Sequence, residues 1–147
     1  MDKVKDQPKP NTIGDDAVIG LFGGLLGGLV MTLVIVLFSL FAGQGLAYLG
    51  YFSTATPVAP LQGGPGTHLA VSCTYGILYS LLVHWLPVFR LRLPGWLLGL
   101  IYGLILWVFA ITILLPAAQS IMLTLPWYVF FCGHAAYGLV LGWRHGP

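Results

Sequence analysis

An uncharged apolar run at residues 17–42 constrains this sequence more than any other feature. About 20 apolar residues carry an α-helix across the hydrocarbon core of a bilayer, so this run can cross with some tilt. Three further apolar runs follow, at residues 68–87, 95–115 and 127–143. Only 7% of the chain is charged, against roughly 25% in soluble domains, so too few charges exist to build a surface that faces water. We therefore predict an all-α integral membrane bundle of four transmembrane helices.

The segments between these runs carry the signals of tails and loops. Residues 1–16 form a polar tail, and its Asp15 and Asp16 suit a helix N-terminus, where negative charge is favoured. Residues 43–67 are rich in Gly and Pro and form the first predicted outer loop, with a short interfacial piece at 46–52; residues 116–126 form the second. Pro116 is predicted to end the third helix. Pro126 either kinks a longer fourth helix or separates a short interfacial helix from a span that starts at Trp127. We favour a span at residues 127–143 that is extended upstream by some of residues 120–125.

The charges predict the orientation. With four spans, all six basic residues fall on one side, and both predicted outer loops are uncharged. The positive-inside rule then places both termini in the cytoplasm, in the inner membrane of a bacterium. Aromatic residues fit the two interfaces, with Trp85, Trp96 and Trp143 at the inner ends and Trp127 and Tyr128 at the outer ends. The basic residues are Lys3, Lys5, Lys9, Arg90, Arg92 and Arg144.

Glycines recur every four residues within the runs, a spacing that places them on one stripe of a helix and allows close helix packing. One interpretation is packing within the chain alone. The other is that a glycine face binds a helix of another membrane subunit, because two glycine faces on the first helix exceed what one neighbour needs. The glycines are Gly20, Gly24 and Gly28 with Gly23 and Gly27 in the first run, Gly95, Gly99 and Gly103 in the third, and Gly138 and Gly142 in the fourth.

No Asp, Glu, Lys or Arg lies within the spans, so we predict no catalytic residue and no metal site. A polar intramembrane cluster remains, and His134 is its main candidate for cofactor binding, although a structural hydrogen bond to a neighbouring helix would also explain it. Cys73 and Cys132 are at similar depth and are either buried free thiols or a disulfide. The cluster comprises Ser72, Cys73, Thr74, Tyr75, Cys132, His134 and Tyr137.

The other histidines are predicted to lie near the interfaces, with His68 solvated at the outer boundary and His84 at the inner one. His68 and His134 differ in depth by roughly 10 Å at 1.5 Å rise per residue, which argues against a haem held by two histidines of this chain. We expect bound lipid and no cofactor held by the chain alone. A haem or a quinone at a subunit interface, in contact with His134, is the alternative.

A weak internal repeat and one resemblance complete the sequence signals. Tyr-Gly pairs occur at Tyr75, Tyr102 and Tyr137, which would fit a duplicated helix hairpin. The stretch from Gly133 to Gly142, with its His-x-x-Tyr-Gly-x-x-x-Gly pattern, resembles the last helix of small four-span bacterial membrane proteins such as the YagU-like family. This resemblance implies no known chemistry.

These features favour a non-catalytic accessory subunit of a larger membrane complex, such as a respiratory or photosynthetic electron-transfer complex. The loop at 43–66 would then contact an extracytoplasmic subunit. A small transporter or channel for a neutral solute is an alternative, lined by Ser72, Thr74, Tyr75, His134 and Tyr137. A cofactor-binding protein that uses His134 is another. The six basic residues form no dense basic face, so nucleic acid is not an expected partner.

Overall fold

The computed structural model describes residues 11–52, 64–85 and 93–143, and within them the chain is helical, with no strand. The prediction of an all-α fold is confirmed for these residues. The basic residues that carry the orientation argument lie outside them, as does His145. The long helices are α1 (Ile13–Phe41), α3 (Gly64–Trp85), α4 (Gly95–Phe109) and α6 (Trp127–Trp143), and the short segments are α2 (Ala47–Tyr51), the π-helical turn η3 (Ala110–Leu114), α5 (Leu115–Ala117) and the 3₁₀ turn η4 (Ile121–Thr124).

Three helical stretches are long and apolar enough to cross a membrane, namely Ile13–Phe41, Gly64–Trp85 and Gly95–Ala117. They contain the first and third predicted runs almost entirely and most of the second. The fourth run forms α6, which starts directly after Pro126. The expected upstream extension is not part of this helix, because Ile121–Thr124 form the separate 3₁₀ turn η4. Its 17 residues give a length of about 25 Å, less than the ~30 Å hydrocarbon core. The fold thus defines a candidate multi-pass membrane protein, and the count of four spans stays a prediction.

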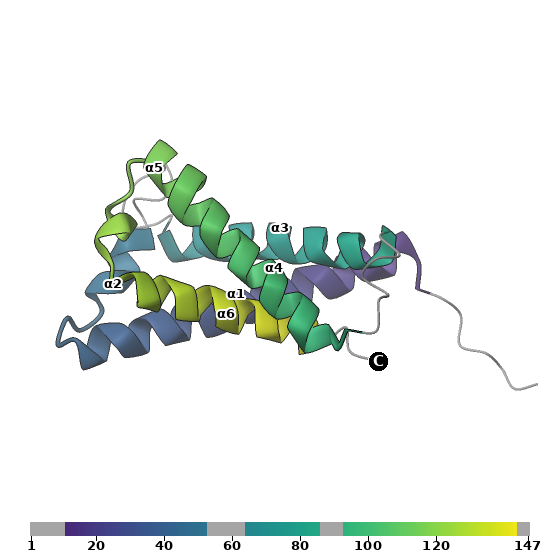
Figure 1. Ribbon diagram of the computed structural model, residues 1–147, viewed down its shortest axis with the longest axis horizontal. Coiled ribbons are helices and arrows are strands. Elements are labelled where there is room, and N and C mark those ends of the chain that lie inside the picture. Colours follow the sequence, from purple (N-terminus) through teal and green to yellow (C-terminus); the bar gives the residue numbers. More distant parts are fainter. Residues whose placement is uncertain (1–10, 53–63, 86–92, 144–147) are drawn as a thin grey trace, which may run out of the picture.

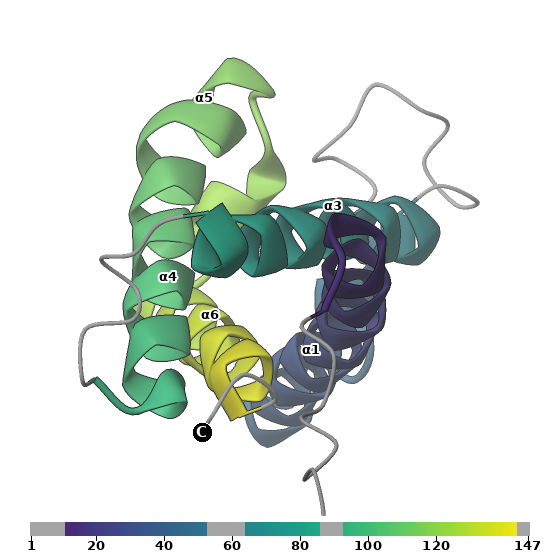
Figure 2. The ribbon, with the colours of Figure 1, turned by 90° about the vertical axis from the view of Figure 1, so that its right-hand side faces the viewer.

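The long helices pack in an order that differs from their order in the chain. α3 packs on α1, α1 on α6, and α6 on α4, an arrangement seen along the bundle in Figure 2. Figure 1 shows that α4 runs obliquely to the other long helices. α3 and α4 stand at the two ends of this series and do not pack extensively against each other.

The start of α1 is fixed by a capping box. The Thr12 hydroxyl accepts a hydrogen bond from Asp15 N (3.2 Å), and the Asp15 carboxylate accepts one from Thr12 N (2.9 Å). These bonds satisfy backbone N–H groups that lack a partner at a helix start. The helix therefore begins at Ile13, four residues before the predicted span. Asp16, one residue further, pairs with His84 near the end of α3 and joins the two helices at that end.

Both glycine faces of α1 are occupied by helices of this chain. The face of Gly20, Gly24 and Gly28 packs on α3, where a Cβ at Gly28 would lie 2.7 Å from the Ser72 side chain. The face of Gly23 and Gly27 packs on α6, where a Cβ at Gly27 would lie 2.8 Å from the Tyr137 ring. The inference of a spare glycine face for another subunit therefore loses its basis.

The contact between α4 and α6 is built from the remaining glycines. A Cβ at Gly99 would collide with the Gly138 carbonyl, and one at Gly142 with the Gly95 carbonyl. A Cβ at Gly103 would meet the His134 carbonyl. The two backbones can approach this closely only because side chains are missing, which is the packing mode expected between helices in lipid.

The third helix does not end at Pro116 as predicted. Proline lacks an N–H, and its ring clashes with the carbonyl four residues earlier, so a regular α-helix cannot pass through it. Here the chain takes a π-helical turn over Ala110–Leu114, in which Leu115 N–H bonds to Ala110 O, and then continues to Ala117. The turn admits Pro116 by shifting the hydrogen-bond register. The helix ends one turn later, where Gln119 adopts a positive φ of 48°.

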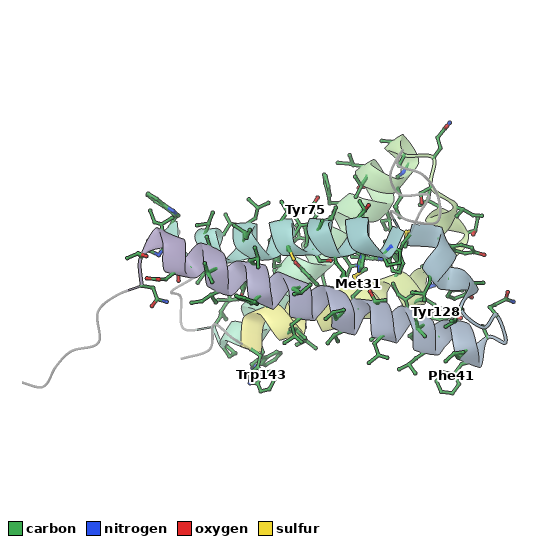
Figure 3. The ribbon with its side chains drawn as sticks, turned by 180° about the vertical axis from the view of Figure 1, so that it is seen from behind. Met31, Phe41, Tyr75, Tyr128 and Trp143 are labelled. Atoms are coloured by element: carbon green, nitrogen blue, oxygen red, sulfur yellow. The ribbon has the colours of Figure 1, made fainter. Side chains whose placement is uncertain are left out.

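The outward faces of the long helices are apolar, as lipid contact requires. Phe22 and Leu33 of α1 are 56% and 57% exposed, and Ile105 of α4 is 59% exposed. Figure 3 shows Trp143 and Phe41 projecting from opposite ends of the bundle. The predicted interfacial residues Trp85, Trp96, Trp127, Tyr128 and Trp143 are all exposed.

Candidate functional site

A cavity of about 200 Å³ lies between α3, α4 and α6. Its wall comes from the part of each helix nearer to α2 and α5, so the cavity occupies the predicted outer half of the bundle. Apolar side chains such as Met31 and Leu106 form most of the surface. The polar contributions come from Thr67, His68, Ser72, Tyr75, His134 and Tyr137.

The cavity opens onto the side of the bundle, between α3 and α4. Val71 of α3, Phe109 of α4 and Leu114 of η3 line it and are each 37–39% exposed. These residues belong to the apolar surface that would face lipid. A molecule dissolved in the membrane could therefore enter from the side, between the two helices at the ends of the packing series.

Tyrosines close the cavity toward the other half of the bundle. The Tyr102 hydroxyl of α4 donates a hydrogen bond to Tyr75 O of α3 (2.8 Å), and the Tyr102 and Tyr79 rings contact each other with centroids 5.0 Å apart. Tyr79 is fully buried. This contact joins α3 to α4 at the level where glycine pairs hold α4 against α6, so the cavity is closed at that end.

His134 is buried in the wall and is held by its own helix. Its Nδ1 lies 2.9 Å from Phe130 O, one turn earlier in α6. Because a carbonyl oxygen only accepts, Nδ1 carries the hydrogen of this bond. This hydrogen bond runs to Phe130 of the same helix and not to a neighbouring helix, which was the alternative considered from the sequence.

His68 is not at a solvated boundary, which corrects the prediction. It is half-buried, with its ring stacked against Phe52 at a centroid distance of 4.3 Å, and it lies beside the backbone of Gly28. Its Nε2 is buried and has no hydrogen-bond partner in the described part of the chain. Depth counted along straight helices separates His68 from His134, whereas in the folded chain both residues line one cavity.

The structure divides the predicted polar cluster into two groups. Ser72, Tyr75, His134 and Tyr137 line the cavity. Thr74 is exposed on another face of α3, where its hydroxyl bonds to Ala70 O, so it cannot line a path with the others. Cys73 and Cys132 are half-buried free thiols, and neither lines the cavity.

Sequence reasoning missed several residues that shape this site. Phe52 and Met122 come from segments outside the four runs, and Ala110 lies in the π-helical turn. The proline at 116 was the available signal for an irregular helix at this depth, since π turns often occur at functional sites. Among the described residues no group of three His, Cys, Asp or Glu could hold a metal ion.

Comparison of the chain with protein-family models, with curated proteins and with solved structures gives no match in any of the three. The resemblance to YagU-like proteins thus gains no support beyond the stretch from Gly133 to Gly142 itself. What the protein does has to be argued from the cavity.

Proposed function

We propose that this protein is a four-span membrane protein that binds a small lipid-soluble molecule in the cavity between α3, α4 and α6. The single observation that carries this proposal is the composition and position of the cavity. Apolar walls and a few polar groups in a concave site are typical of small-molecule binding sites. The opening between Val71 and Phe109 faces the surface that lipid would cover, which supports access from the membrane.

Binding fits the geometry better than passage of a solute. A channel or transporter needs a route to the other side of the membrane, and the helices below the cavity are in backbone contact at Gly99 and Gly142. The Tyr102 to Tyr75 hydrogen bond lies between the cavity and that half of the bundle. A haem or quinone at His134 would belong to the same class of function, because each would be a small molecule bound within the membrane.

The four-span topology is part of the proposal. α6 is short for a span, but Trp127 and Trp143 stand exposed at its two ends, 68% and 80%, where a membrane-crossing helix places interfacial aromatics. α6 also packs between α1 and α4, so it shares their position in the bundle. The orientation with both termini in the cytoplasm rests on the basic residues of the sequence.

Native mass spectrometry of protein purified from its own membranes tests the binding function. We expect a bound molecule on the wild type that is absent from Ala110→Phe, because Ala110 lines the cavity and is buried, so a phenyl ring there would fill it. The matched control is Ile105→Phe, five residues away in the sequence on the exposed face of the helix. A wild type without any bound molecule, or equal occupancy in all three proteins, would contradict the proposal.

The accessory-subunit role is a second candidate, favoured by the predicted outer segments that carry no charge. Such segments suit contact with another protein or with the lipid surface. Its support from the glycine faces is gone, because those faces pack within the chain. Purification in mild detergent tests it directly, since an accessory subunit should bring stoichiometric membrane partners with it and a protein that acts alone should not.

A further inference from the structure

Several side chains around the cavity donate their hydrogen bonds to backbone carbonyls. The Tyr137 hydroxyl donates to Ser72 O at 2.6 Å, and the Ser72 hydroxyl donates to His68 O at 2.8 Å. His134 Nδ1 donates to Phe130 O at 2.9 Å. The hydrogen of each of these groups is therefore already in a hydrogen bond and is not available to a ligand.

The consequence is clearest for His134. Its surroundings are apolar, and the described residues that line the cavity include no carboxylate, so a charged imidazolium would be costly there. In the neutral ring only one nitrogen carries hydrogen, and that is Nδ1. Nε2 of His134 therefore presents a lone pair and can only accept. The hydroxyls of Thr67 and Tyr75 can donate or accept, so they do not discriminate between ligands.

From this inventory we infer that the cavity selects a lipid alcohol, a single apolar chain with a hydroxyl group that donates to His134 Nε2. The inference rests on the proposed binding function and names its ligand class. A ketone, ether or quinone oxygen is an acceptor only, and it would leave the His134 lone pair without a partner. Leaving a buried polar group unpaired costs more than an average hydrogen bond gains.

The opening of the cavity also fits a ligand of this shape. The opening between Val71 and Phe109 is apolar, so a hydrocarbon chain can leave through it into the membrane while the hydroxyl stays inside. The cavity thus suits a polar head that is small and a tail that is not enclosed.

The test compares two probes of nearly the same size, 1-decanol and 1-fluorodecane, titrated onto the full-length protein in detergent. The fluorine atom replaces the hydroxyl and cannot donate. The quantity compared is the ratio of the 1-fluorodecane dissociation constant to the 1-decanol dissociation constant. We expect this ratio to be about tenfold higher on the wild type than on His134→Leu, because the variant has lost the preference for the alcohol. Partition into detergent micelles affects both proteins equally and cancels in this comparison. His84→Gln, at the other end of α3, is the control and should keep the wild-type preference.

The outcomes separate the inference from the function on which it rests. If the wild type binds both probes with equal affinity, the alcohol inference is wrong and the binding function stands. If neither probe binds, both fail. If His134→Leu still prefers 1-decanol to 1-fluorodecane, another group accepts the hydrogen bond of the alcohol and the role inferred for His134 is wrong. The wild-type ratio, corrected for the partition of each probe measured in protein-free micelles, needs no variant. An unfolded His134→Leu would therefore not protect the inference from refutation.

Discussion

Single residues at the two ends of the bundle show how much of the fold depends on groups that are far apart in the sequence. Asp16 and His84 are separated by 68 positions and yet form the pair that joins α1 to α3. All four Asp lie far from the histidines in the sequence, so the pairing of Asp16 with His84 could not be predicted from it. At the opposite end, Gln119 holds a left-handed backbone conformation that glycine adopts at lower cost.

Gln119→Gly should stabilise the protein. The substitution removes the steric penalty of a side chain at a φ of 48°, and we expect a gain of about 1 kcal/mol in the free energy of unfolding. Thermal unfolding monitored by circular dichroism would measure it. Gln44→Gly, at an exposed position without a positive φ, is the control and should not stabilise. Equal effects at both positions would contradict the assignment of strain to Gln119.

Removing the pair at the inner end should loosen the contact between α1 and α3. Asp16→Asn is expected to cost about 0.5–1 kcal/mol, because the partners are only partly buried and such pairs contribute little. His84→Gln should have a similar effect, and the double variant should cost less than the sum of the two. Strictly additive losses in a denaturation experiment would mean that the two side chains do not interact.

At the level of helices, glycine spacing predicted packing faces but not which helices share them. The face of Gly24 was recognisable from its four-residue period, whereas its partner on α3, Ser72 with Gly76, follows from the order in which the helices pack. That order depends on loops and helix tilts that periodicity does not encode. The same limit applies to the site. Tyr75, His134 and Tyr137 are recognisable in the sequence as intramembrane polar residues, but the side chains that meet them in the cavity depend on the folded chain. Phe52 and Met122 are two of these side chains.

The contact between α4 and α6 gives a sharp test of glycine packing. Gly99→Ala should destabilise the bundle by about 1–3 kcal/mol, because its Cβ would collide with the backbone of Gly138 and neither helix can yield locally. Gly50→Ala is the matched control, since a Cβ at Gly50 meets nothing within 4 Å. Unfolding in a graded detergent mixture would compare the two. A Gly99→Ala protein as stable as Gly50→Ala would show that α4 and α6 are not in backbone contact.

For the whole molecule, composition was enough to predict the class, a helical protein that crosses a membrane. It was not enough to predict how the helices are arranged. Few charges and long apolar runs indicated helices that cross a membrane, and three such stretches are present. The cavity could not be anticipated, because it arises where α3 and α4 stand at opposite ends of the packing order. Depth counted along straight helices also separated His68 from His134, and the folded bundle places both in one wall.

The topology has its own measurement. In a Cys73→Ala, Cys132→Ala background, Gln44→Cys should react with a membrane-impermeant maleimide added outside intact cells, whereas Asn11→Cys should react only after permeabilisation. Both positions are exposed at opposite ends of α1, so access to the reagent depends on the side of the membrane alone. The reverse pattern would overturn the orientation that the basic residues predict.

The most direct test of the central claim is where a membrane-dissolved probe attaches. A fatty alcohol with a diazirine group near its hydroxyl would be cross-linked in intact membranes, and the labelled residues would be mapped by mass spectrometry. We predict labels on the cavity-lining parts of α3, α4 and α6, around Ser72, Ala110 and His134, that disappear in Ala110→Phe and persist in Ile105→Phe. Labels confined to exposed positions such as Phe22 and Leu33, and unchanged in Ala110→Phe, would contradict the account.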